Sequence, residues 1–174
     1  MKKSLICLGT TVLLLTSAFA ESGNVYAKGN NEKKLSETYE INWTEAWEEV
    51  ENLNESTGFG STNTPGEIGV FAYGDLASGS TGVAAATISS VESTGKTTGK
   101  ILSTVTSATT SIQNVRLDKT VYGSKGIAIG KFTSSSTAAI NLSSTYSLYV
   151  GLSIHTATNS GVLFESKTAA NRFY

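Results

Sequence analysis

The sequence predicts a mainly β protein. We expect a single sandwich-like or barrel-like domain of antiparallel strands, preceded by a signal peptide, a polar linker and one short amphipathic helix. Three observations lead to this prediction. Short β-branched runs recur between Gly, Ser and Thr throughout 57–174. The clearest of these runs alternates apolar and polar residues. The stretch 41–56 instead repeats its apolar residues at helical spacing.

Residues 1–20 have the layout of a secretory signal peptide. A basic start (MKK) precedes a mainly apolar stretch, and AFA at 18–20 supplies a small-x-small cleavage signal. A single membrane anchor is the alternative, but interspersed Thr and Ser dilute the run below the roughly 20 apolar residues that a span needs. Cleavage after residue 20 removes the only cysteine. An exported chain without disulfides indicates a bacterial protein, and we expect a Gram-positive source and a secreted, extracellular product that begins at Glu21.

The charge is distributed unevenly along the mature chain. Residues 21–56 hold nine acids against three bases, a net charge of −6, whereas residues 57–174 hold eight bases against five acids, a net charge of +3. The part from 21 to 40 is polar and lacks apolar periodicity, which is typical of a linker. A nucleic-acid partner is not expected, because such proteins carry clustered Lys and Arg.

An acidic amphipathic helix is predicted at 41–56. Its apolar residues fall at i, i+3, i+4, i+7 and i+10: Trp43, Ala46, Trp47, Val50 and Leu53. Asn42 as N-cap, with Glu45 three residues later, makes a capping box. We expect this face to pack on the β-body 57–174. The alternative hypothesis is that Trp43 and Trp47, the only two tryptophans, bind a partner.

The strands of the body are clearest between residues 138 and 156. The residues expected on the inward face are Ile140, Leu142, Tyr146, Leu148, Val150, Leu152 and Ile154. The residues expected on the outward face include Tyr149, Ser153 and His155. A continuous strand of this length would reach about 60 Å at ~3.3 Å per residue. We therefore expect a break near Ser143.

The stretch ESTGKTTGK at 92–100 contains the tail of a P-loop and the spacing of a serine–lysine pair. A P-loop would need glycine where Ser90 stands, and the β-branched residues that follow would make a poor helix. A serine–lysine nucleophile opens a helix and works with a distant K-T-G. The sequence therefore predicts a polar hairpin loop here, at the tip of a hairpin that spans 82–112.

No catalytic residues, metal ligands or cofactor are predicted. His155 is the only histidine, so a two-histidine metal site is impossible, and no G-x-S-x-G elbow supports a triad. The few acids of the body are scattered among its strands and turns. We expect a protein that is not an enzyme.

Two classes of function remain open. The first is a binding or matrix module of the cell envelope, whose partner is a glycan, an envelope polymer or a protein. Aromatic residues on polar faces can stack on sugars, and the candidate ligand-binding residues are Tyr73, Tyr122, Tyr149 and His155. The second is a membrane-acting or antibacterial protein, similar to a bacteriocin or toxin, that uses the Ser/Thr-rich hairpin at 82–112.

Overall fold

The computed structural model describes residues 32–34, 41–62 and 74–174. Within these ranges the chain is mainly β, which confirms the predicted class: two antiparallel sheets with one short α-helix. The strands are β1 (Glu32–Lys34), β2 (Ser56–Phe59), β3 (Ala77–Thr87), β4 (Ser90–Gly99), β5 (Val105–Asn114), β6 (Lys119–Tyr122), β7 (Gly126–Ile129), β8 (Thr133–Asn141), β9 (Leu148–Asn159) and β10 (Val162–Phe173). The helices are α1 (Trp43–Glu48) and the 3-10 turns η1 (Val50–Asn52) and η2 (Val115–Leu117).

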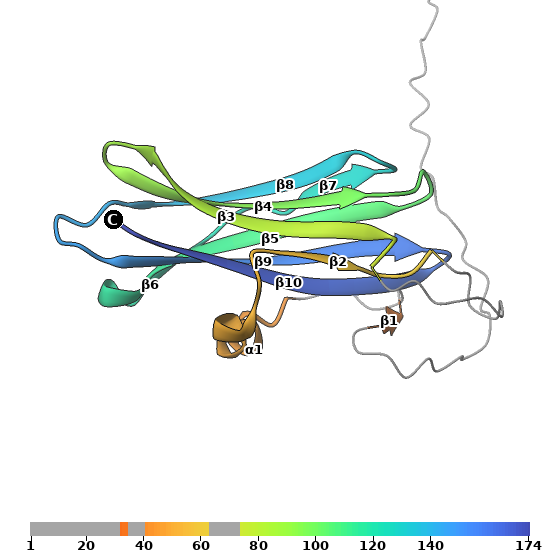
Figure 1. Cartoon of the computed structure of the whole chain (residues 1–174), viewed down its shortest axis with the longest axis horizontal. Coiled ribbons are helices and arrows are strands. Elements are labelled where there is room, and N and C mark those ends of the chain that lie inside the picture. The colour runs from red at the N-terminus through yellow and green to blue at the C-terminus, as the bar shows by residue number, and fades with distance from the viewer. Residues whose placement is uncertain (1–31, 35–40, 63–73) are drawn as a thin grey trace, which may run out of the picture.

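The two sheets form two layers (Figure 1). The six-stranded sheet has the order β1-β10-β9-β5-β6, with β7 also paired to β5. The four-stranded sheet has the order β2-β3-β4-β8. Consecutive strands β4 and β5 therefore belong to different sheets, and the turn between them crosses from one layer to the other.

Hydrogen bonds tie the two sheets together along both sides. On one side, Asn54 accepts a bond from the backbone of Ala169 in β10, and the next residue, Glu55, accepts one from Thr81 in β3. On the other side, the Ser136 hydroxyl of β8 accepts from the backbone N–H of Thr110 in β5 at 3.0 Å. These bridges occupy backbone and side-chain groups that would otherwise be open at the edges of the sheets.

Strand β9 is covered on both faces, and this corrects the expected orientation of its residues. Leu152 and Ile154 are buried as predicted, beneath the apolar face of α1. Ser153 and His155 were expected to face solvent, and that expectation is wrong: both are buried against the four-stranded sheet. Tyr146, expected in the core, lies in the loop before β9 and is mostly exposed.

The break predicted near Ser143 is confirmed, since β8 ends at Asn141 and β9 begins at Leu148. The predicted loop at 92–100 is wrong. It is almost entirely the strand β4, and the β3–β4 turn lies at 88–89. Residues 82–112 are therefore not one hairpin. They contain the end of β3, all of β4 and most of β5.

The space between the sheets is filled largely by small and polar side chains. Glycines make this close approach possible. A Cβ added to Gly79 would lie 2.5 Å from Cδ2 of His155, and one added to Gly95 would lie 2.5 Å from Oγ of Ser153. The glycines of β3 and β4 therefore leave room for side chains of β9, instead of forming the turn that their frequency predicted.

Replacing Gly79 by alanine is expected to lower the free energy of unfolding by about 1–3 kcal/mol, because the new methyl group overlaps the fixed ring of His155. Gly82, on the same strand, is the matched control. A Cβ there would meet nothing within 4 Å, so Gly82→Ala should leave stability unchanged or raise it slightly. Urea unfolding of both variants measures the difference. Equal effects would show that the sheets are not in close contact at Gly79.

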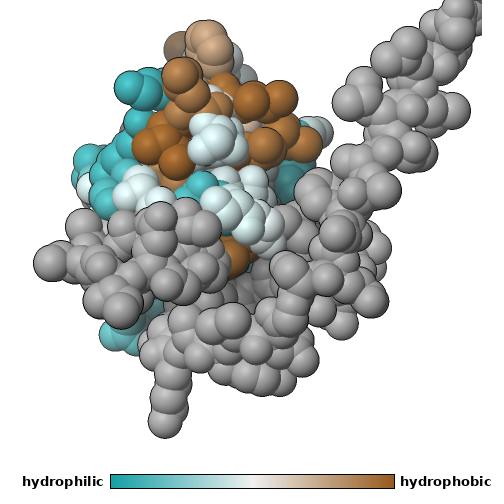
Figure 2. Space-filling view, turned by 90° about the vertical axis from the view of Figure 1, so that its right-hand side faces the viewer, coloured by the Kyte–Doolittle hydropathy of each residue, from teal (hydrophilic) through white to brown (hydrophobic). Residues whose placement is uncertain are grey.

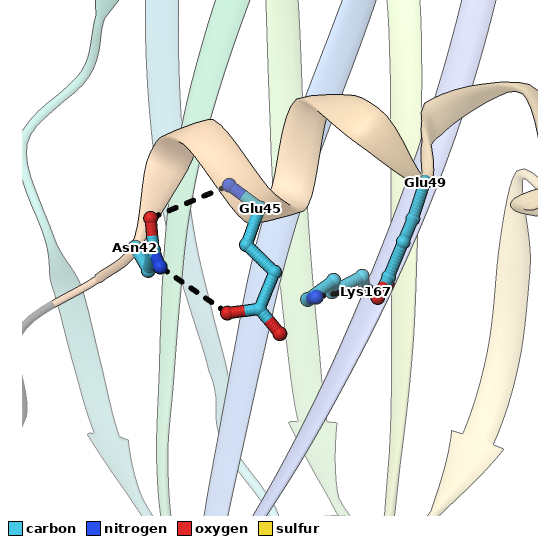
Figure 3. A network of polar contacts seen from close by, with 4 residues as sticks. All are labelled: Asn42, Glu45, Glu49 and Lys167. Atoms are coloured by element: carbon cyan, nitrogen blue, oxygen red, sulfur yellow. Dashed lines mark hydrogen bonds and ion pairs between the residues drawn. The ribbon is translucent and has the colours of Figure 1, made fainter.

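The capped start of the predicted helix is confirmed. Asn42 Oδ1 accepts from the backbone N–H of Glu45 at 3.3 Å, and Asn42 Nδ2 donates to Glu45 Oε2 at 3.2 Å (Figure 3). At the other end, Glu49 forms an ion pair with Lys167 of β10 at 2.9 Å. The regular α-helix covers only part of the expected range 41–56. Its buried Ala46 and the partly buried Trp47 pack over β9 and β10.

Candidate binding surface

The structure does not bring the predicted ligand-binding residues together. Tyr73 lies outside the described residues. Tyr122 is exposed at the end of β6, and its ring centroid lies 4.9 Å from that of Trp43. Tyr149 is fully buried, and its hydroxyl accepts from the backbone N–H of Ser143 at 2.6 Å. Tyr149 therefore stabilises the loop before its own strand.

His155 is enclosed between the two sheets. Its Nδ1 lies 2.8 Å from the Thr97 hydroxyl, and its Nε2 lies 2.7 Å from the Thr168 hydroxyl. The Thr97 hydroxyl gives its single hydrogen to the carbonyl of Ser107 at 2.7 Å, so it accepts from His155 Nδ1. The neutral ring then accepts at Nε2 from Thr168, which in turn lies 2.5 Å from the Thr81 hydroxyl.

This chain of hydrogen bonds runs through the interior and requires no charge on the ring. Burial lowers the pKa of His155 from 6.5 to about 4, because the charged form would lose its hydration. A neutral, fully buried histidine with both nitrogens occupied holds two sheets together. It does not reach a ligand at the surface.

Trp43 and Trp47 also pack against other residues of the molecule. Both pack against the cluster of Leu152 and Ile154, as expected for a docked helix. Among the described residues, Trp47 Nε1 is buried and has no hydrogen-bond partner. Trp43 is partly exposed and contacts Tyr122. The aromatic face of the helix is thus largely used within the molecule.

A different surface stands out on the outer side of the four-stranded sheet. Its outward side chains are mostly short hydroxyls, aligned in rows by the strand register. We call this the hydroxyl face: Ser56, Ser78, Ser80, Thr94, Thr98, Thr133, Ser135 and Thr137. The rows place Ser78 beside Thr98 and Thr133, and Ser80 beside Lys96 and Ser135.

The hydroxyl face is hollowed where β2, β3 and β4 lie side by side. This depression has a volume of about 430 Å³. It is lined by Ser56, Thr57, Gly58, Ser78, Gly79, Ser80, Lys96, Thr98 and Lys100. The lining contains two cations and no acid. Lys100 donates to the carbonyl of Gly74 at 2.6 Å, whereas Lys96 is exposed and forms no ion pair with any residue that the structure describes.

No family model, curated protein or solved structure matches this chain. Its candidate function therefore rests on the chemistry of its own surfaces. The residues that the structure describes have two further features that bear on that chemistry. They contain no cluster of three or more His, Cys, Asp or Glu side chains placed to hold a metal ion. They also contain no helix with the length and apolar character needed to cross a bilayer.

The hydroxyl face was missed by the sequence prediction. In β8 the residues TSSST place hydroxyls on both faces of the strand, since Ser134 and Ser136 are buried and their neighbours are exposed. In β4 hydroxyls also occur on both faces, and the outward side includes Glu92 and Lys96. The sequence signal is therefore the density of Ser and Thr, which does not show which of them face outward.

Proposed function

We propose that this chain is a secreted, non-enzymatic binding protein whose two sheets form a sandwich. Its hydroxyl face would hold an anionic, hydroxyl-rich polymer of the bacterial cell envelope. The observation that carries the proposal is the depression between β2, β3 and β4, where hydroxyls surround Lys96 and Lys100. Hydroxyls donate and accept, so they suit a polyol or glycan. The lysines add attraction for phosphate or carboxylate groups.

The surroundings of the histidine support a binding role over a catalytic one. Acid–base catalysis needs a titratable group within reach of the substrate. The only histidine of the sequence is enclosed between the sheets, and both of its nitrogens are hydrogen bonded. The hydroxyl face offers many polar contacts and two cations, which is the composition of a surface that holds a ligand in place.

The membrane-acting alternative was based on a hairpin over 82–112 with its tip at 92–100. That hairpin is replaced by three strands in two sheets. The tip of the real β3–β4 hairpin is formed by Ile88 and Ser89. The alternative therefore loses the feature that motivated it, and a role at membranes needs a separate observation.

The test is retention of the mature protein on insoluble cell walls of a Gram-positive bacterium. Lys96→Gln is expected to weaken retention about tenfold, since a charge-assisted contact is lost. Lys119→Gln removes an exposed charge from β6, in the other sheet, and should leave retention unchanged. Salt should weaken wild-type binding, because exposed charges are screened.

Equal retention of the two variants would refute the proposed surface. Removing anionic polymers from the walls with mild acid, before the assay, should abolish binding if the ligand is anionic.

The export step is checked separately. Mass spectrometry of the culture supernatant should find a chain that begins at Glu21, and a chain that keeps Met1 in the membrane fraction would contradict secretion.

A further inference from the structure

An exposed apolar patch lies at the end of the molecule where β4 turns into β5 and β7 turns into β8. It consists of Leu102, Val105, Ile127, Ile129 and Phe132. Figure 2 shows hydrophobic residues gathered at this end. Four of the five are more than half exposed: Leu102 by 78%, Phe132 by 77%, Ile129 by 67% and Ile127 by 65%. We call this the apolar end.

The strand pairing holds these residues close together. Val105 of β5 is paired with Ile129 of β7, and Ser107 of β5 is paired with Ile127. The two turns also meet, because the backbone N–H of Gly130 donates to the carbonyl of Thr104 at 2.6 Å. The patch is therefore one surface, formed by two neighbouring turns and the edge strand between them.

A basic residue accompanies the patch. Lys131 stands directly before Phe132 and is exposed, whereas Lys100 lines the depression and donates to the carbonyl of Gly74. The two turns, residues 100–104 and 130–132, contain no Asp or Glu. Apolar side chains on turns, with an exposed lysine beside them, match the boundary between the acyl chains and the headgroups of an anionic bilayer.

We infer that the apolar end binds the surface of an anionic lipid membrane. Leu102, Ile129 and Phe132 enter the acyl boundary, and Lys131 contacts the anionic headgroups. A second copy of the chain suits this surface less well. In a two-fold contact the patch of one copy meets the same patch of the other, so both copies of Lys131 would lie in one interface. Two like charges in one interface oppose association.

The inference is independent of the proposed function, because the apolar end and the depression with Lys96 involve different side chains. An envelope protein with both would contact a membrane through one end and a polymer through one sheet face. The two tests can fail separately, since vesicles contain no wall polymer and isolated walls contain no lipid.

The experiment is co-sedimentation of the mature full-length chain with vesicles. One set contains phosphatidylcholine alone, and the other contains phosphatidylcholine and phosphatidylglycerol in equal parts. Binding is expected to the anionic vesicles. Phe132→Ser and Leu102→Ser should each weaken it about tenfold or more, because one apolar side chain is withdrawn from the acyl boundary. Lys131→Gln should weaken it about fivefold.

Ile88→Ser is the matched control, since Ile88 is fully exposed at the β3–β4 turn, outside the apolar end. It should bind like the wild type. All positions are exposed, so the variants should fold, and circular dichroism verifies this. The inference is overturned if the wild type does not sediment with anionic vesicles, or if Ile88→Ser weakens binding as much as Phe132→Ser. It is also overturned if light scattering shows a dimer that Phe132→Ser dissociates while vesicle binding is absent.

Discussion

Replacement of Leu152 by alanine is expected to lower the free energy of unfolding by about 2–5 kcal/mol, the range for buried leucines. Leu152 is fully buried in the middle of β9, and its side chain packs in the cluster that includes Ala46 and Trp47. The truncation leaves a cavity beneath α1. Urea unfolding measures the loss of stability. Tryptophan fluorescence should shift to the red as the helix loosens.

Leu102→Ala is the matched control, because that leucine is 78% exposed. Its effect should stay within about 0.5 kcal/mol, as for ordinary surface positions. A comparable loss in the two variants would mean that α1 does not cover β9 in solution. In that case the partner-binding hypothesis for Trp43 and Trp47 would regain support.

The second large expected effect is a loss of folding stability at acidic pH. His155 has a pKa of about 4 in the folded protein and 6.5 as the ordinary value. Above pH 6.5 the ring is neutral in both states and contributes no pH dependence. Between pH 6.5 and 4 the unfolded chain takes up a proton that the folded chain does not, so stability falls as the pH falls. The full loss is about 3 kcal/mol, and below pH 4 this contribution levels off.

His155→Asn isolates this contribution. The asparagine amide can still donate towards Thr97, but it cannot take up a proton in this range. The variant should be less stable at neutral pH, because contact with Thr168 is lost. Its stability should then decline less steeply than that of the wild type between pH 6.5 and 4. Parallel curves for the two proteins, from urea unfolding at a series of pH values, would show that His155 titrates normally and is open to solvent.

The sequence predicted the parts of the fold that depend on contacts between near neighbours in the chain, or on a repeating pattern of apolar residues. Asn42 and Glu45 cap the helix through contacts three residues apart, and the apolar residues of β9 mark the face under α1. The orientation of His155 could not be predicted in the same way. An isolated polar residue on a strand indicates solvent, unless the partners that satisfy it come from other strands. Those partners, Thr97 and Thr168, are distant in the sequence.

The strand β4 was missed for a related reason. Its glycines and hydroxyls are the residues that usually form turns. Here Gly95 faces Ser153 across the interior. The sequence of β4 alone does not reveal this contact. The hydroxyl face was missed because it is assembled from four strands, of which β2 and β8 are separated along the chain from the hairpin β3–β4. Only the register places Ser80, Lys96 and Ser135 in one row.

The polar interior also affects what fixes the register of β4. Inward Ser93 and Thr97 differ little in chemistry from outward Thr94 and Thr98. A slip of β4 by one residue would exchange these two sets, and the only apolar side chain of this strand that it would turn outward is that of Val91. The same slip would turn Glu92 and Lys96 towards the interior, where a charge without a partner is costly. The register of this strand is therefore fixed by its charges, and by the missing side chain at Gly95 that leaves room for Ser153, more than by its apolar residues.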